Sequence, residues 1–182
     1  KVLIFLIILS FSAPVFSQKS ARAFDFTEYG VTIQPDKRVI VVLAALDAAG
    51  LKTPLTESGV EFRRKLETDQ AGISEKLRER MATFVSQYKK RHANATDAEL
   101  IAPFISMAYT LSPVPDLMEP NRNTDLPGNL LDVLDFSPLV REFYRNSQFD
   151  QRIEGYVKIY QKAGDELRPS ASLMIGQLLD YL

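Results

Sequence analysis

The densest group of side chains capable of chemistry lies between residues 116 and 135, where the carboxylates are Asp116, Glu119, Asp125, Asp132 and Asp135. Two carboxyl groups about 5 to 9 Å apart are enough for glycoside hydrolysis. One hypothesis is therefore a stand-alone periplasmic hydrolase that uses acidic residues of the 116–135 loop. Acidic side chains in exposed loops are common, however, and no neighbouring residue type indicates an activated carboxyl group.

Part of the same region has the outline of a calcium loop. Oxygen-bearing side chains alternate from Asn121 to Asp125, and Asp132 falls at the twelfth position of such a loop. The sixth position is Leu126 where glycine is needed, and Arg122 adds a positive charge. The pattern favours a polar turn over a calcium site. Asp125 and Asp132 remain the strongest candidates for an acid–base pair or for calcium ligation.

His92 is the only histidine, and the chain has no cysteine. A zinc site or a Ser-His-Asp triad cannot be assembled conventionally from such a chain. The sequence also lacks a His-Glu-x-x-His helix, a Gly-x-Ser-x-Gly elbow and a phosphate-binding glycine loop. We therefore assign no catalytic, metal-binding or cofactor-binding residue, imply no cofactor, and expect His92 to cap a helix or lie at the surface.

A stripe of aromatic residues offers a different kind of site. Its members recur at roughly helical spacing and are Phe143, Tyr144, Phe149, Tyr156 and Tyr160. They could line the groove of a periplasmic ligand-binding protein. Large aromatic side chains at such spacing more often build the core of a helical domain, so the core interpretation is favoured.

The elements that must position these residues are helices. The patterns predict helices over residues 37–49, with Gly50 as the residue after the end, over 58–68 and over 74–92. A capping box at Thr96 and Glu99 begins another helix that runs to about residue 111, and Pro103 either kinks this helix or moves its start later. Leu77, Phe84, Phe143 and Tyr156 lie on apolar helix faces, and we expect them to be buried.

Prolines and glycine break the chain after this helix. Pro113, Pro115, Pro120, Pro127 and Gly128 predict a long irregular connection over residues 112–128. Ser137-Pro138 is typical of a helix start, and residues 146–148 form a turn. The remaining chain is either two helices or one long helix kinked at Pro169. No segment alternates as a strand does, so the expected fold is all-α, an irregular domain of about six to seven helices.

The first seventeen residues form a separate segment. Lys1, the apolar run over residues 2–9 and the small residue Ser17 are typical of a secretory signal peptide. Ser10, Ser12 and Pro14 interrupt the run, which is too short to span a membrane. The expected organisation is a signal peptide at 1–17, a linker at 18–36 and a helical domain at 37–182, in a protein exported to the periplasm or outside the cell.

Composition narrows the classes of partner. Removing the signal peptide leaves roughly 165 residues, enough for one domain with its own core. The formal net charge is −1, so we expect no nucleic-acid partner. Without cysteine there is no disulfide framework and no lipidated residue, so we expect no stable membrane anchor after signal cleavage. The start at Lys1 and the apolar run over residues 178–182 predict that the parent protein is longer.

Two segments carry a family resemblance. The stretch from Ser137 to Phe149, followed by Tyr156 to Tyr160, resembles a pattern in uncharacterised secreted bacterial proteins, and Arg38 to Gly50 is similar to the opening helix of that group. In those proteins a helical N-terminal region precedes a domain similar to zinc peptidases. The present chain lacks the two-histidine helix of an active metallopeptidase, so the resemblance supplies no catalytic residue.

These observations favour a noncatalytic helical scaffold or interaction module of an exported bacterial protein. The resemblance implies that a peptidase-like domain follows it. Its partner would then be another protein or a downstream domain of the same chain. The acidic hydrolase and the ligand-binding protein are the alternatives.

The signal-peptide interpretation predicts that residues 1–17 are absent from the exported protein. N-terminal sequencing of exported material should begin near Gln18, because the small residue Ser17 suits signal peptidase. A mature protein that still begins at Lys1 contradicts this prediction.

Overall fold

The computed structural model describes residues 24–26, 34–52, 57–69, 72–122 and 125–181. The predicted signal peptide at 1–17 and most of the predicted linker at 18–36 lie outside these ranges. All regular structure within them is helical, which confirms the all-α prediction. The seven α-helices are α1 (Lys37–Ala48), α2 (Glu57–Asp69), α3 (Glu75–Arg91), α4 (Asp97–Thr110), α5 (Gly128–Leu134), α6 (Ser137–Asn146) and α7 (Ile153–Tyr181), and a 3₁₀ turn, η2 (Phe149–Gln151), precedes α7.

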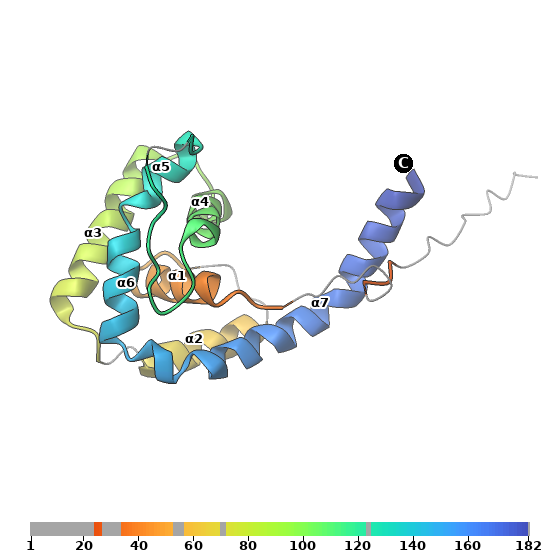
Figure 1. Cartoon of the computed structure of the whole chain (residues 1–182), viewed down its shortest axis with the longest axis horizontal. Helices are drawn as coiled ribbons and strands as arrows, with labels where there is room; N and C mark the ends of the chain where they lie inside the picture. The colour runs from red at the N-terminus through yellow and green to blue at the C-terminus, as the bar shows by residue number, and fades with distance from the viewer. Residues whose placement is uncertain (1–23, 27–33, 53–56, 70–71, 123–124, 182) are drawn as a thin grey trace, which may run out of the picture.

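Helix α1 lies at the centre of the molecule and contacts α3, α4, α6 and α7 (Figure 1). Its apolar residues from Ile40 to Leu46 are buried on almost every side. A helix that is hydrophobic all round belongs in a core. The helix ends where the sequence predicted, because Gly50 adopts a positive φ of 85° directly after it.

The start of α1 is tied to the end of α4. The Asp36 side chain caps α1 by accepting a hydrogen bond from the Arg38 backbone N–H at 2.8 Å. The Arg38 guanidinium binds the Asp36 carboxylate and also donates to the carbonyl oxygens of Tyr109 and Leu111 at 3.0 and 2.9 Å. The hydrogen bond from the Arg38 side chain is the main reason that the pKa of Asp36 is lowered.

Helix α4 begins at the predicted capping box. Thr96 accepts from the Glu99 backbone N–H at 3.3 Å, and the Glu99 carboxylate accepts from the Thr96 N–H at 2.8 Å. Pro103 therefore lies inside the helix, and a later start is wrong. Because proline has no N–H, the Glu99 carbonyl loses its usual partner in the helix.

An aromatic cluster joins α3 and α4 to the residue before α6. Phe104 has no exposed surface, and its ring lies 5.2 Å from that of Tyr88 and 5.3 Å from that of Phe136. Leu77, Phe143 and Tyr156 are buried as expected. Phe84 was also expected to be buried, but it is only partly buried. The buried face of α3 is formed by Leu77, Met81, Val85 and Tyr88, and Phe84 lies at the edge of that face.

The irregular connection predicted over residues 112–128 occupies 111–127. Its first part closes into a loop, because the Ser112 N–H donates to the Met118 carbonyl at 2.9 Å and the Met118 N–H donates to the Ser112 hydroxyl at 2.8 Å. The sequence did not predict α5, which follows directly. This helix has only seven residues and no side-chain cap, so it leaves neither a period nor a start signal.

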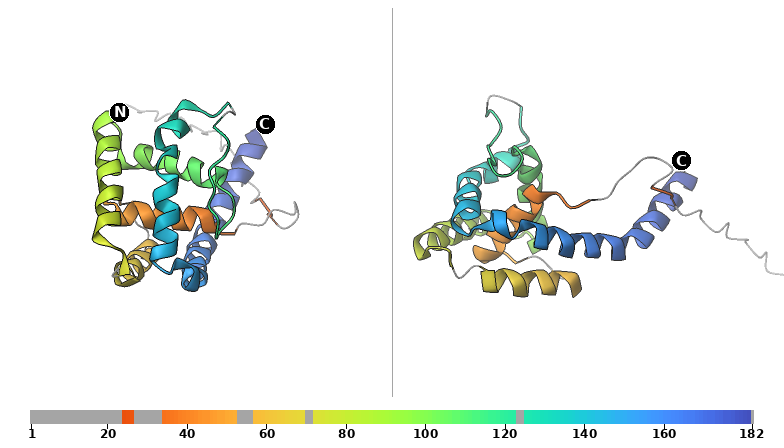
Figure 2. Two further views of the ribbon diagram at one scale, coloured as in Figure 1. Left: turned by 60° about the vertical axis from the view of Figure 1, so that its left-hand side comes forward. Right: turned by 60° about the horizontal axis from the view of Figure 1, so that its bottom comes forward.

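The last element is one helix of 29 residues that continues through Pro169. Its first half runs beside α2 (Figures 1 and 2). The Phe62 ring of α2 lies 5.2 Å from the Tyr156 ring, and the Tyr156 hydroxyl donates to the Asp69 carboxylate at 2.6 Å. Burial, and then this hydrogen bond, raise the pKa of Tyr156. The second half of α7 extends away from the other helices in Figure 1 and in the right-hand view of Figure 2.

Two phenylalanines of the aromatic cluster should differ in their contribution to stability. Phe104→Ala should lower the free energy of unfolding by about 3 to 5 kcal/mol, because it empties a fully buried site. Phe84→Ala should cost clearly less, because part of that ring already faces solvent. Urea unfolding of both variants measures the difference. Equal losses contradict the packing described for this cluster.

Candidate functional site

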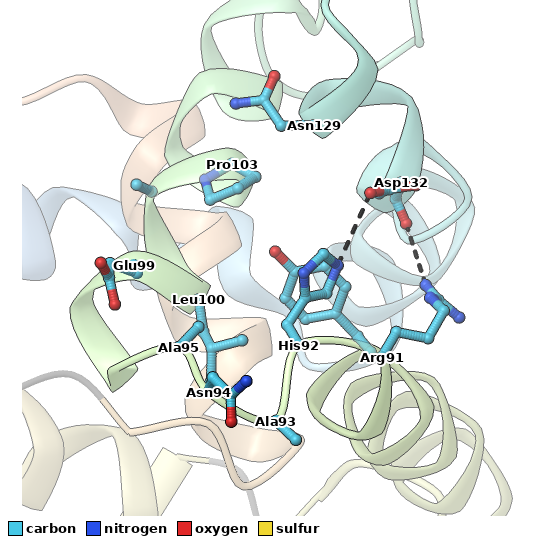
Figure 3. Close-up of a pocket in the computed structure, with 12 residues that line it drawn as sticks. Arg91, His92, Ala93, Asn94, Ala95, Glu99, Leu100, Pro103, Asn129 and Asp132 are labelled. Carbon is cyan, nitrogen blue, oxygen red and sulfur yellow. Dashed lines mark hydrogen bonds and ion pairs between the residues drawn. The ribbon is translucent and has the colours of Figure 1, made fainter.

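An open hollow of about 620 Å³ lies between the end of α3, the first half of α4 and α5 (Figure 3). Aromatic and polar side chains line it. They include Tyr88, Arg91 and His92 from the end of α3, Glu99 and Pro103 from α4, and Asn129 and Asp132 from α5.

His92 and Asp132 face each other in this hollow. The His92 Nε2 atom lies 3.7 Å from the Asp132 Oδ2 atom, and the His92 ring centre is 4.5 Å from the centre of the Tyr88 ring. The Arg91 guanidinium reaches the Asp132 backbone carbonyl at 3.5 Å. Figure 3 shows His92 and Arg91 both directed at Asp132. As expected from the sequence, His92 ends a helix: it is the residue after the last turn of α3, and its N–H donates to the carbonyls of Tyr88 and Lys89.

The contacts of the polar side chains in this hollow do not form a catalytic arrangement among the described residues. The His92 Nε2 atom is buried and makes no hydrogen bond within the described residues, since 3.7 Å is too long for one. Burial, together with the Asp132 carboxylate, raises the pKa of the Tyr88 hydroxyl. The described lining contains no serine, threonine, cysteine or lysine that His92 could activate as a nucleophile.

The structure separates the carboxylates that the sequence grouped together. Glu119 and Asp135 both bind the Arg122 guanidinium, at 3.1 and 2.6 Å. Glu119 also accepts the hydroxyl hydrogen bond of the buried Ser137 at 3.1 Å. These two carboxylates therefore fasten the irregular connection to the start of α6.

The other three acidic residues are distributed differently. Asp116 and Asp125 are exposed in the connection. Asp132 was expected in a loop, which is wrong, because it lies on α5 and faces His92. No hydrogen bond or ion pair among the described residues joins Asp125 to Asp132.

The structure describes only part of the segment that has the calcium-loop pattern. Its third and fourth positions, residues 123 and 124, lie outside the described residues. Elsewhere in the described chain, no three histidine, cysteine, aspartate or glutamate side chains gather in a way that would hold a metal ion.

The aromatic stripe belongs to the core. Phe143, Tyr144, Phe149 and Tyr156 are buried, and the stacked rings of Phe149 and Tyr156 lie 4.8 Å apart. Tyr160 is partly buried against Phe62, and burial is the main cause of its raised pKa. These contacts confirm the core interpretation over the groove.

A second surface was missed in the sequence. Five large apolar side chains of the second half of α7 are exposed, which we call the α7 surface: Leu167, Leu173, Met174, Leu178 and Leu179. The sequence shows these residues as a continuation of a helical pattern. The signal that could have found the surface is the density of large apolar residues between 167 and 179. None of the helices in the described part of the chain is long and apolar enough to span a membrane.

Comparison of the chain with protein-family models, curated proteins and solved structures finds no match. The resemblance to secreted bacterial proteins stays a prediction. Any function must therefore be argued from the two surfaces described above.

The geometry predicts that the chain does not hydrolyse peptide or glycoside substrates, with or without added calcium or zinc. Two of the five carboxylates are held by Arg122, and the described residues around His92 include no serine, threonine, cysteine or lysine. Assays of release from a panel of both substrate types provide the measurement. Turnover that disappears on Asp125→Asn or Asp132→Asn contradicts the prediction and favours the acidic hydrolase.

Proposed function

We propose that this chain is a noncatalytic helical interaction module of an exported bacterial protein, and that it holds a protein partner on the α7 surface. The observation that carries the proposal is the exposure of this surface. Leu167, Met174 and Leu178 are 57%, 58% and 59% exposed. Single exposed apolar residues are ordinary, but a contiguous group on one projecting element is typical of a protein interaction site.

The rest of the molecule is suited to hold this surface in place. The first half of α7 is fixed to α2 by the Phe62, Tyr156 and Asp69 contacts. The projecting half continues the same helix, so its backbone hydrogen bonds are formed before any partner arrives. A preformed binding element loses less conformational entropy on association than a flexible one.

The proposed export of the module and the domain expected after it still rest on the sequence. Residues 1–17 support export, and the resemblance to secreted bacterial proteins supports a peptidase-like domain after the helical region. Under this proposal the partner is another protein or such a downstream domain. The hydrolase alternative is less well supported, because Arg122 already binds Glu119 and Asp135.

Site-specific photocrosslinking in the producing cells tests the proposal. A benzoylphenylalanine at position 178 should form a discrete protein adduct, because an apolar partner surface covers this side chain. The same residue at position 131 is the matched control, since Leu131 is an exposed leucine on α5.

Met174→Lys should lower the yield of the adduct at position 178, because it places a charge beside the crosslinker. Equal labelling at 178 and 131, or no adduct at 178, overturns the proposal.

A further inference from the structure

The second half of α7 has little support from its own sequence. Pro169 lies inside it and has no N–H, so the Asp165 carbonyl loses its usual helix partner. Gly176 follows, and proline and glycine are the two residue types that least favour a helix interior. The stretch from Pro169 to Tyr181 is close to the length, roughly 12 to 15 residues, at which isolated helices are marginal in water. Its helical state therefore depends on contacts from elsewhere in the chain.

Residues 24–26, which we call the strap, supply such a contact. The Phe24 backbone N–H donates to the Ser172 carbonyl at 3.0 Å, and the Ser172 hydroxyl donates to the Phe24 carbonyl. Ser172 lies about one helical turn after Pro169. The strap is therefore bound directly beyond the break that the proline makes, and Figure 1 shows it beside this half of α7.

The strap also has a hydrophobic anchor. The Phe26 side chain is only 7% exposed, and its ring centre lies 5.1 Å from that of Phe24 in an edge-to-face arrangement. Phe26 is not among the buried residues that form the core around α1. Its burial therefore holds the strap in place without being part of that core.

The docked strap leaves the α7 surface open. It binds Ser172, which is not one of the five residues of that surface. Leu173 and Met174 follow Ser172 directly, and they are 46% and 58% exposed with the strap in place. The strap thus supports the helix from one side, while the apolar side chains stay accessible to a partner.

We propose that the strap keeps α7 helical beyond Pro169, so that the α7 surface is formed only while residues 24–26 are docked. The inference rests on the proposed function and adds the regulation of that site. When the strap leaves, the turn after Pro169 loses two hydrogen bonds, and the apolar side chains no longer share one rigid helix. Strap docking and partner binding require the same helix, so each strengthens the other.

Hydrogen exchange of the full chain, followed by mass spectrometry, tests the strap with Phe26→Ala. This substitution leaves the sequence of α7 unchanged, so a helix that is stable by itself should not respond. We expect the amides of residues 173–179 to exchange about tenfold faster, because the buried anchor of the strap is lost. The amides of α1 should exchange at the unchanged rate, because Phe26 lies outside the core around that helix.

A matched pair of serine variants gives a second measurement. Ser172→Ala removes the hydroxyl that donates to Phe24, whereas Ser170 is an exposed serine on the same helix. Alanine favours a helix more than serine does, so Ser170→Ala should slow the exchange of residues 173–179 or leave it unchanged. Ser172→Ala should accelerate this exchange about threefold, because the lost hydrogen bond outweighs the gain in helix propensity.

Exchange of residues 173–179 that does not respond to Phe26→Ala overturns the role of the strap. If Phe26→Ala accelerates exchange in α1 as well, the serine pair decides, and equal rates for Ser170→Ala and Ser172→Ala overturn it.

The crosslink from position 178 separates this inference from the proposed function. The expected exchange rates without an adduct at 178 support the strap and overturn the interaction module. An adduct at 178 whose yield is the same in Phe26→Ala, together with unchanged exchange, overturns the strap and leaves the interaction module standing.

Discussion

Helix α1 imposes the constraint on which the rest of the fold depends. Its residues from Ile40 to Leu46 are apolar on all sides of the helix, so no orientation of α1 could leave one face in water at low cost. Helices α3, α4, α6 and α7 each cover a part of it. Arg38 then fixes the direction of α1 by binding carbonyl groups at the end of α4. Once these four helices surround α1, the first half of α7 is held in place and its second half must leave the domain.

The parts of this fold that could be predicted are those with local causes. Thr96 and Glu99 satisfy backbone groups within one turn, Gly50 supplies a positive φ, and Ser137-Pro138 begins α6. Such signals act between near neighbours in the chain, so the sequence alone displays them. Helix α5 has no such signal. Its start is formed by Pro127, which has no side chain able to cap it.

The candidate sites depend on contacts between distant residues and were therefore harder to predict. His92 and Asp132 were each singled out, but for different reasons, and only the folded position of α5, which packs against α4, brings the two side chains to 3.7 Å. Arg122 entered the sequence analysis as an obstacle to calcium binding, and in the structure it is the cation that holds Glu119 and Asp135. The apolar residues of the α7 surface are visible in the sequence. Their exposure is not, because it depends on where the other helices pack.

The contact between Phe24 and Ser172 joins residues 148 positions apart in the chain. Closing so large a loop costs entropy that grows with the logarithm of its length, so this contact gains most when the intervening helices have already folded and shortened the distance. During synthesis, residues 24–26 leave the ribosome before α7 does, so they cannot make this contact until α7 has followed them. The projecting half of α7 therefore gains its contact with residues 24–26 only after the intervening helices exist, and this contact joins two segments distant in sequence late in folding.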